Sequence, residues 1–341
     1  MNKVILFLLL VFISFESFAA CSYGGGSGAN VNVNFSGAKI LSDASVPAGT
    51  ILAVKTVGGN VSNMKTFSNC GENDIYAIVA TPGVNEVAGI TGIQGGTVYE
   101  SGIPGIGFQI SDAITGSKIR PVPATIGTVS AKGINSSSVD QLTVWLIKTK
   151  DTIDTSKGVQ NVSISYRAGT VNEVQKNSTI ARLLQANIIF GPFNYRATSC
   201  EITPRNSATV TLPTIEAKVL RTLAQGDSTN YAKDITLDIN CPDSTVGNDF
   251  IYWFNPITEN SSNKKGVLLN SVPVSAGGAK DVGFIIKSGS TPIEFYDYTS
   301  YKIKGIKKTQ AINLNVDYYR LSTTISQGEV HAIFEVVIQE Q

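Results

Sequence analysis

Apolar and polar residues alternate along much of this chain. Runs of this kind span residues 31–35, 162–166, 235–239 and 312–316. Alternation with period two over four to seven residues is typical of strands that bury one face. The segments between these runs are rich in glycine, asparagine, serine, aspartate and proline, which favour turns. The pattern therefore predicts an all-β protein.

Helical periodicity is nearly absent. The best helical candidate, residues 173–186, is better explained by strands and a turn. Many short strands with regular turns are typical of a β-sandwich. A Gly-Pro pair at 191–192 interrupts the pattern, and proline cannot donate a hydrogen bond to a sheet. We therefore expect two tandem sandwiches, over 21–191 and 200–341, with a linker at 192–199. An ordinary loop inside one large domain is the alternative.

Residues 1–20 have the features of a secretory signal peptide. Lys3 precedes a ten-residue apolar stretch that is too short to span a bilayer, and Ala20 supplies a small residue for cleavage. A lipoprotein signal with Cys21 as the acylated residue is the alternative, but Phe18 stands where such signals normally have leucine. No later stretch reaches 18 apolar residues, so we expect an exported protein that is not integral to a membrane.

The four cysteines are expected to form two disulfides, because the chain is exported and their number is even. Three pairings are possible. The local pairing joins Cys21 to Cys70 and Cys200 to Cys241 and places one bridge in each half of the chain. We expect this pairing. A zinc site would need close pairs such as C-x-x-C, and the sequence has none.

The charge balance and the histidine count exclude several classes of function. The chain has 27 basic and 26 acidic residues, so it lacks the basic excess of a nucleic-acid-binding protein. Its single histidine, His331, rules out a multi-histidine metal site and leaves little for histidine-based catalysis. We interpret His331 as a surface residue. No P-loop or G-x-S-x-G elbow occurs. We expect no enzymatic activity, no cofactor and no metal.

The C-terminal half carries motifs at characteristic positions. Cys200 is followed by a V-x-L-P segment at 210–213, and Cys241 ends an alternating apolar run. Gly328 is the fourteenth residue from the end, and alternating apolar residues follow it. These features resemble the pilin domain of chaperone–usher fimbriae of Gram-negative bacteria. One departure is Glu340, since the family usually has an aromatic residue at the penultimate position.

The resemblance implies an incomplete immunoglobulin-like sandwich that lacks its last strand. In the family, a periplasmic chaperone and later the next fimbrial subunit donate a strand to the open groove, and an outer-membrane usher is a further partner. The terminal apolar alternation agrees with this, because such a strand needs neighbours on both sides. A complete sandwich with an ordinary last strand is the alternative. The expected groove residues are Val330, Ala332, Phe334, Val336 and Ile338.

A further domain before a pilin domain is the layout of a two-domain tip adhesin. Shaft pilins begin with a donor segment ahead of their first cysteine, but Cys21 lies at the expected mature N-terminus. A subunit that accepts a strand and donates none is expected at the tip of a fimbrium, on the cell surface. The alternative is a structural tip or initiator subunit that is not adhesive.

The N-terminal half resembles, more weakly, the mannose-binding adhesin of type 1 fimbriae, in residues 24–54 and around Cys70. In that family a polar segment after the second cysteine ends in Asn-Asp before an aromatic residue and carries part of the sugar pocket. Here Asn73, Asp74 and Tyr76 follow Cys70, displaced by an insertion. The resemblance implies a lectin-like domain, whose receptor we expect to be a glycan or a matrix protein; mannose itself does not carry over.

Sugars need planar donors and acceptors and an aromatic face, and these three side chains offer such groups beside a disulfide. An ordinary polar turn after a cysteine is the alternative, because asparagine and aspartate favour turns in any case. The loops at 135–138 and 150–154 are further candidates for the binding site.

Overall fold

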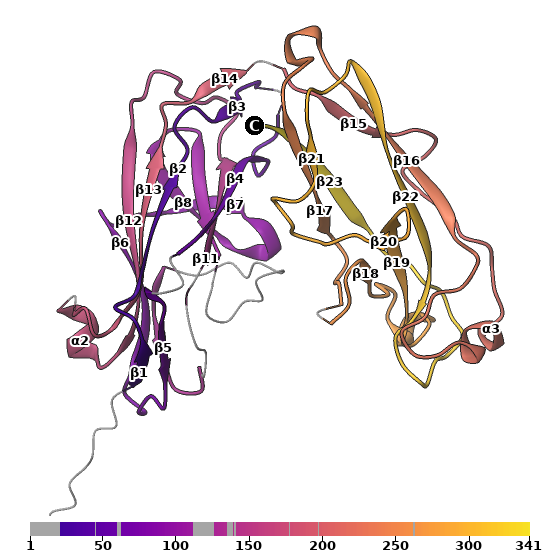
Figure 1. The fold of residues 1–341 in the computed structure, drawn as a ribbon, viewed down its shortest axis with the longest axis horizontal. Coiled ribbons are helices and arrows are strands. Elements are labelled where there is room, and N and C mark those ends of the chain that lie inside the picture. The colour runs from indigo at the N-terminus through magenta and orange to yellow at the C-terminus, as the bar shows by residue number, and fades with distance from the viewer. Residues whose placement is uncertain are drawn as a thin grey trace, which may run out of the picture.

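The computed structural model describes residues 21–44, 46–59, 63–111, 126–134, 139, 141–176, 178–196, 198–261 and 263–341. The expected signal peptide and the candidate loop at 135–138 lie outside the described residues. The strands form two groups of sheets, one ending at Arg196 and the other beginning at Glu201, and the two groups stand side by side (Figure 1). The prediction of an all-β fold with two tandem sandwiches is confirmed.

The N-terminal sandwich contains two five-stranded sheets and two small ones. One large sheet has the order β10 (Gly127–Ser130), β6 (Ile75–Thr81), β12 (Gln160–Gly169), β13 (Arg182–Phe190) and β2 (Ala29–Asn34). The other has the order β4 (Ile51–Gly58), β11 (Gln141–Lys148), β9 (Ile106–Ile110), β8 (Thr97–Ile103) and β7 (Glu86–Thr91). The small sheets pair β1 (Ser22–Gly25) with β5 (Lys65–Ser68), and β3 (Lys39–Leu41) with β14 (Asn194–Arg196).

The C-terminal sandwich contains two further sheets. The larger has the order β15 (Glu201–Pro204), β16 (Lys233–Asn240), β22 (Thr309–Arg320), β19 (Val282–Ser288) and β18 (Val267–Leu268), with β20 (Thr291–Pro292) beside β19. The smaller has the order β21 (Lys302–Ile303), β17 (Phe250–Pro256) and β23 (Phe334–Glu340). The described helices are α2 (Val171–Gln175) and α3 (Ala217–Thr222), with 3-10 turns η2 (Ile93–Gly95), η3 (Asp243–Thr245) and η4 (Val274–Ala276). None of these described helices is long and apolar enough to cross a membrane.

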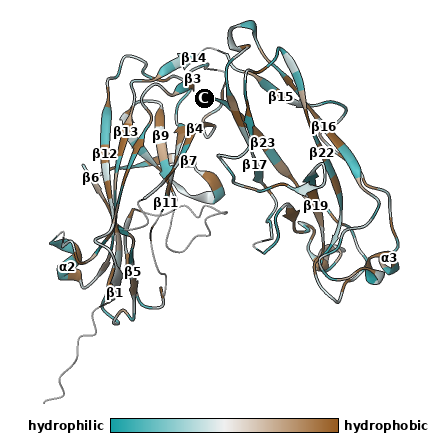
Figure 2. Ribbon diagram, in the orientation of Figure 1, coloured by the Kyte–Doolittle hydropathy of each residue, from teal (hydrophilic) through white to brown (hydrophobic). Residues whose placement is uncertain are grey.

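The alternating sequence pattern has the expected structural cause. In β2 the residues from Ala29 to Asn34 alternate strictly between buried and exposed. In β16 the apolar Ile235, Leu237 and Ile239 are buried, and Thr236 between them is only partly so. Figure 2 shows the same alternation of hydrophobic and hydrophilic segments along the strands. Each of these strands therefore turns one face to the core, as the period of two predicts.

The helical candidate at 173–186 contains part of one short helix, which the strand-and-turn interpretation missed. The helix α2 begins after Thr170, whose hydroxyl accepts a hydrogen bond from the Glu173 backbone N–H. The Glu173 carboxylate in turn accepts from the Thr170 backbone N–H, at 2.9 Å. This capping box stabilises a helical start that has little apolar periodicity of its own. The chain then turns and enters β13 at Arg182, which agrees with the strand and the turn that the sequence predicts for this segment.

The strand β11 is buried on both faces, and the second sandwich is the reason. Val144 and Leu146 belong to the core of the N-terminal sandwich, whereas Trp145 and Ile147 pack with the core residues of the C-terminal one. All four are fully buried. The two sandwiches therefore share an apolar junction, because the outer face of one sheet is covered by the next domain.

The expected linker at 192–199 includes a strand. Residues 194–196 form β14, which pairs in parallel with β3 of the N-terminal sandwich. The chain leaves this sandwich only after Arg196, five residues beyond the expected boundary at residue 191. The short parallel pair is not visible as a pattern in the sequence, because three residues are too few to show alternation.

Candidate functional site

The loop after Cys70 lies at one end of the N-terminal sandwich. A disulfide joins Cys21, before β1, to Cys70, after β5. Figure 1 shows β1 and β5 at the opposite end of this sandwich from β3 and β14, where the chain passes to the second sandwich. A second disulfide joins Cys200 to Cys241. Both predicted pairings are confirmed, and the first holds the candidate loop at the end away from the crossover.

The structure does not bring the three candidate side chains together on one surface. Asp74 is only 4% exposed, and its Oδ2 accepts a hydrogen bond from the Gly71 backbone N–H at 2.8 Å. Tyr76 is equally buried, and its ring packs against Tyr166 in the core. Asn73 alone is exposed. Asp74 thus closes the turn and Tyr76 fills the core, so Asn73 is the one candidate side chain of the three that is exposed to solvent.

An ion pair beside Asn73 was not expected from the sequence. Glu72 contacts Lys132, and both side chains are well exposed. The hydrogen bond from Lys132 is the main cause that holds the pKa of the Glu72 carboxyl below its usual value. The two residues are 60 positions apart in the sequence, so no local motif joins them. The described loop after Cys70 therefore exposes the Asn73 amide beside a pair of opposite charges.

The candidate loop at 150–154 lies at the other end of the sandwich. The Asp154 backbone N–H donates to the Pro104 carbonyl at 2.9 Å. Burial, and secondly the charge of Asp154, raise the pKa of Tyr195 in β14. This loop therefore lies near the crossover between the sandwiches, away from the Cys70 loop.

One cluster of potential metal ligands occurs in the described part of the chain. The ligand atoms of Cys21, Cys70 and Asp74 lie within 4.8 Å of one another. However, the two sulfurs are bonded to each other in the disulfide. A metal needs cysteine as the thiolate, so this cluster does not offer a metal centre.

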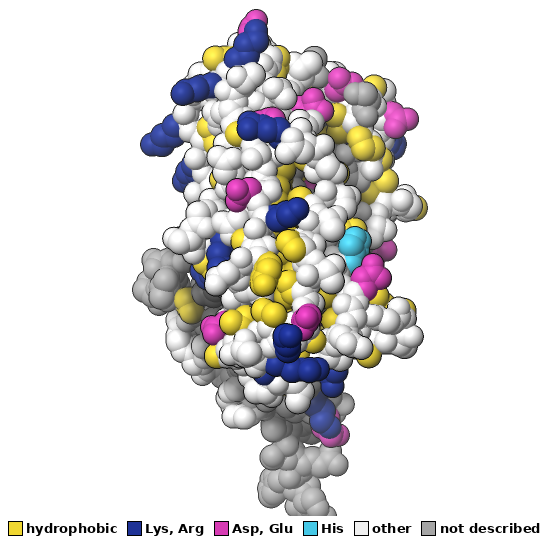
Figure 3. All heavy atoms as spheres, turned by 90° about the vertical axis from the view of Figure 1, so that its right-hand side faces the viewer, with side chains coloured by type: hydrophobic (Ala, Val, Ile, Leu, Met, Phe, Trp, Pro, Cys, Tyr) yellow, Lys and Arg dark blue, Asp and Glu magenta, His cyan; other side chains and the backbone are white. Residues whose placement is uncertain are grey.

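An apolar groove of ≈ 510 Å³ runs along the C-terminal sandwich. One wall is the chain at 202–212, which follows Cys200, and the other is the chain at 330–336, which leads into β23. Figure 3 shows hydrophobic side chains gathered in a band on this side of the molecule. Four of the five expected groove residues line it, namely Val330, Ala332, Phe334 and Val336; Ile338 lies further along β23 and is half-buried.

The floor of the groove is made of core side chains. Its apolar floor residues are Ile235 and Leu237 from β16, Leu268 from β18, Phe284 and Ile286 from β19, and Val316 from β22. The strand β23 pairs with β17 on one side, and β15 pairs with β16. Each of these two strands, β23 and β15, therefore has a second edge, and among the described residues no strand pairs with it. The V-x-L-P segment forms no strand, so this wall is less regular than the sequence suggested.

Gly328 has a clear structural role at the start of the groove wall. Its φ is +153°, a conformation that favours glycine. A Cβ at this position would lie 2.4 Å from the backbone nitrogen of Ala279. The next residue, Glu329, accepts a hydrogen bond from that same N–H at 2.9 Å. Only glycine allows the terminal segment to approach the chain at 277–279 this closely.

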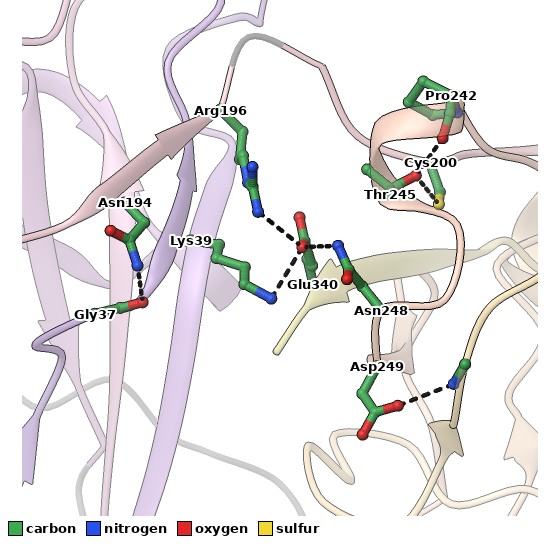
Figure 4. A network of polar contacts seen from close by, with 11 residues as sticks. Gly37, Lys39, Asn194, Arg196, Cys200, Pro242, Thr245, Asn248, Asp249 and Glu340 are labelled. Atoms are coloured by element: carbon green, nitrogen blue, oxygen red, sulfur yellow. Dashed lines mark hydrogen bonds and ion pairs between the residues drawn. The ribbon is translucent and has the colours of Figure 1, made fainter.

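The penultimate residue, Glu340, joins the two sandwiches (Figure 4). Its Oε1 accepts from Lys39 Nζ at 2.9 Å and lies 3.4 Å from Arg196 Nη2, both in the N-terminal sandwich. Asn248 Nδ2 of its own sandwich donates to the same oxygen at 2.7 Å. The Glu340 side chain is 3% exposed. A carboxylate at position 340 can bind the cationic side chains of Lys39 and Arg196, which an aromatic side chain could not do in the same way.

Residues 184–341 match the family model described as "Fimbrial protein". This segment spans β13, β14 and the whole C-terminal sandwich with its groove. The C-terminal sandwich is therefore similar to fimbrial proteins. The matched family is one of fimbrial proteins, and no enzyme family is indicated.

The solved structures that match this chain include several fimbrial proteins. The CupB6 tip adhesin from Pseudomonas aeruginosa is 16% identical over 93% of both chains, with a TM-score of 0.32. The receptor-binding domain of the adhesin MrkD1P of Klebsiella pneumoniae is 20% identical and covers 53% of this chain and 98% of that one, with a TM-score of 0.29. CfaE, the adhesive subunit of CFA/I fimbria of enterotoxigenic Escherichia coli, is 10% identical over 92% and 98%, with a TM-score of 0.24. None of the curated proteins matches this chain significantly.

Proposed function

We propose that this fimbrial protein is a two-domain tip adhesin. In this proposal the N-terminal sandwich binds a receptor, a glycan or a matrix protein, outside the cell. After export of the chain, the C-terminal sandwich accepts a strand from a periplasmic chaperone. The next subunit then replaces this strand with its own at an outer-membrane usher. The apolar groove of the C-terminal sandwich is the observation that carries the proposal.

The backbone on the two sides of the groove suits an added strand. The strand β23 uses one edge for seven residue pairs with β17, so its other edge is available toward the groove. An extended peptide laid along this edge would extend the sheet and satisfy backbone N–H and C=O groups. Alternate side chains of the peptide would then enter the groove, because side chains in a strand alternate between faces.

The side chains of the groove favour the same occupant. Phe334 and Val336 are only half-buried although they are strongly apolar, and they face the floor residues Leu237 and Val316 across the groove. Contiguous exposed apolar surface is unfavourable in water and is typical of an interaction site. An incoming strand with apolar residues at alternate positions would remove this surface from water.

The receptor site is proposed at the end of the N-terminal sandwich that carries the Cys70 loop. Asn73 is exposed there, beside the Glu72–Lys132 ion pair. The disulfide at Cys70 restrains this loop. The end lies away from the crossover between the sandwiches (Figure 1), so a receptor can reach it while the C-terminal sandwich is joined to a fimbrium.

An array of glycans and matrix proteins, probed with the mature full chain, tests the adhesive function. We expect at least one receptor class to bind, and Asn73→Ala with Lys132→Ala to reduce that binding. Asn187→Ala, an exposed asparagine on β13, is the matched control and should bind as the wild type does. If fimbriae assemble with this subunit and the array and whole cells show no binding, the structural tip or initiator subunit is the correct function.

A further inference from the structure

In the described part of the chain, the two large sheets of the N-terminal sandwich have four edge strands, and three of these edges are protected. Lys55 reaches the end of β2 and donates to a backbone carbonyl there. In β4 the Val54 backbone N–H donates to Gln339 Oε1 of the second sandwich, at 3.2 Å. In β7, Val87 and Ile90 pack with the core of the second sandwich. Charged side chains and covering elements of this kind keep an edge strand from pairing with another chain.

The fourth edge strand, β10, has none of these protections among the described residues. Its sequence, Gly-Thr-Val-Ser, contains no charged residue and no proline, and all four residues are exposed. The strand pairs with β6 on one side, and no described strand pairs with it on the other. An exposed, uncharged edge of this kind is a template for a further strand.

The register between β10 and β6 shows which backbone groups point to the open side. The backbone N–H of Ala131, the residue after β10, donates to the Asp74 carbonyl at 2.9 Å. Hydrogen-bonded and non-hydrogen-bonded pairs alternate along an antiparallel ladder. The N–H and C=O groups of Val129 therefore point to β6, and those of Thr128 and Ser130 point away from it. Two donors and two acceptors thus line the open edge.

The side chains of β10 suit a partner strand in which apolar and polar residues alternate. Val129 is paired with Tyr76 and lies on the same inner face of the sheet, yet it is 54% exposed. Thr128 and Ser130 lie on the outer face, because side chains alternate between faces along a strand. A strand laid along β10 would place an apolar side chain beside Val129, which removes apolar surface from water, and polar side chains beside the two hydroxyls.

The open edge belongs to the end of the sandwich where the receptor site is proposed. Lys132, two residues after β10, contacts Glu72 in the loop after Cys70. The turn that follows β10 is tied to the same loop, because Ala131 donates to the Asp74 carbonyl. A strand added to β10 therefore lies beside the loop that the receptor is proposed to reach.

We propose that the receptor is a protein and that an extended, uncharged segment of it adds to the open edge of β10 as a further strand. The carbonyls of this segment accept from the N–H groups of Thr128 and Ser130, and its N–H groups donate to their carbonyls. An extended polypeptide fits because it repeats donors and acceptors at the spacing of a strand. Collagen does not fit, because its chains are wound in polyproline-type helices. The proposal rests on the adhesive function proposed above and names the class of receptor.

Amide NMR with the mature full chain, whose C-terminal groove is occupied by one equivalent of donor peptide, tests the site. The probe is a short peptide in which valine and threonine alternate between two terminal lysines that keep it soluble. The control peptide has the same sequence with its central residues N-methylated, so it keeps the side chains and loses the backbone donors. We expect the amide signals of Thr128 and Ser130 to shift with the probe and not with the control. No shift with the probe, or equal shifts with the control, would overturn the proposal.

Two substitutions at one position assign the binding to the backbone of β10. Thr128→Pro removes an outward N–H and leaves the hydrogen bonds between β10 and β6 in place, since proline is tolerated in an edge strand where its nitrogen faces solvent. Thr128→Ala keeps this N–H. We expect Thr128→Pro to bind the probe about tenfold more weakly than Thr128→Ala, measured on the Ser130 signal. Equal affinities of the two variants would show that the edge is not the site, and the N-methylated peptide gives the same test without any substitution.

The array of glycans and matrix proteins separates this proposal from the adhesive function on which it rests. We expect the wild type to bind a non-collagenous matrix protein and Thr128→Pro to lose that binding. Binding of glycans or collagen alone would overturn the proposed class of receptor and leave the adhesive function standing. A chain that binds the probe at β10 and no receptor on the array would retain the strand-accepting edge and refute the adhesive function.

Discussion

Trp145 and Tyr298 meet edge to face across the junction of the two sandwiches, with ring centroids 5.8 Å apart. Trp253 packs on the same tyrosine at 5.5 Å. Trp145 is fully buried although it lies on the outer face of its own sandwich. Such aromatic pairs contribute about 0.5–1.5 kcal/mol beyond the area they bury. The domains of this chain are thus held together by an apolar core, in addition to the polar contacts of Glu340.

Trp145→Ala is expected to uncouple the two sandwiches. The truncation of a buried tryptophan typically costs about 3–5 kcal/mol, and here the loss falls on the junction. With a donor peptide bound in the C-terminal groove, calorimetry should show one joint transition in the wild type and two separate transitions in the variant. Val129→Ala, at an exposed valine on β10, serves as the control and should leave the joint transition intact. A single unshifted transition in Trp145→Ala would mean that the junction does not couple the domains.

Glu340→Gln is expected to weaken the polar side of the same junction. The substitution removes the charge that Lys39 and Arg196 share, while an amide oxygen can still accept from Asn248. Because Arg196 is well exposed, we expect a loss of about 1 kcal/mol, measured by denaturant unfolding at low salt. High salt should reduce the difference between the variant and the wild type. Glu329→Gln, an exposed glutamate ahead of β23, should show no such difference, and an equal loss there would contradict the account.

Gly328→Ala is expected to disturb the groove wall. A Cβ would come within 2.4–2.6 Å of three backbone atoms of residues 277–279, so the terminal segment must shift in addition to adopting a strained φ. The strained conformation alone costs about 1–3 kcal/mol. Gly289→Ala is the matched control, since its φ is +61° and nothing lies within 4 Å of its Cβ position. Thermal unfolding should show a larger loss for Gly328→Ala than for the control; equal losses would mean that the close approach is not needed.

Asp317→Asn is expected to stabilise the chain in a pH-dependent way. Burial raises the pKa of the Asp317 carboxyl, although Thr229 and the Tyr318 backbone donate hydrogen bonds to it. Because the pKa of Asp317 is higher in the folded chain than in the unfolded chain, protonated Asp317 stabilises the fold at low pH. This contribution to the free energy of unfolding is lost as the pH rises through the pKa of the folded state. The free energy of unfolding of the variant should therefore exceed that of the wild type increasingly as the pH rises above about 4, and the two should be equal below that pH. A constant difference at all pH values would show that ionisation of Asp317 does not matter.

The fold was predictable where a strand buries one face. The apolar residues of β16 and β2 alternate cleanly, and these strands are found where the sequence places them. The pilin-like motifs of the C-terminal half, including Gly328, also predicted the fimbrial protein domain. Such features are local, because they depend on the period of one strand or on the conformation of one residue.

The parts that escaped prediction depend on contacts between distant segments. The burial of Trp145 comes from the second sandwich, and the role of Glu340 comes from Lys39 and Arg196 of the first. The same holds for the candidate loop. Asp74 and Tyr76 have the residue types of a sugar site, but the fold uses one to close a turn and the other to fill the core. Residue type and spacing do not indicate which way a side chain points.

Unfolding of the full chain with and without a donor peptide tests the central claim, that the C-terminal groove accepts a strand, most directly. The peptide carries apolar residues at alternate positions, and the control peptide has the same composition with the alternation broken. We expect the chain alone to aggregate or to unfold with low cooperativity. The alternating peptide, at a hundred times its Kd, should stabilise it by about 2.7 kcal/mol, while the control peptide should not. A full chain that is monomeric, unfolds cooperatively without any peptide and gains nothing from the alternating one would contradict the account.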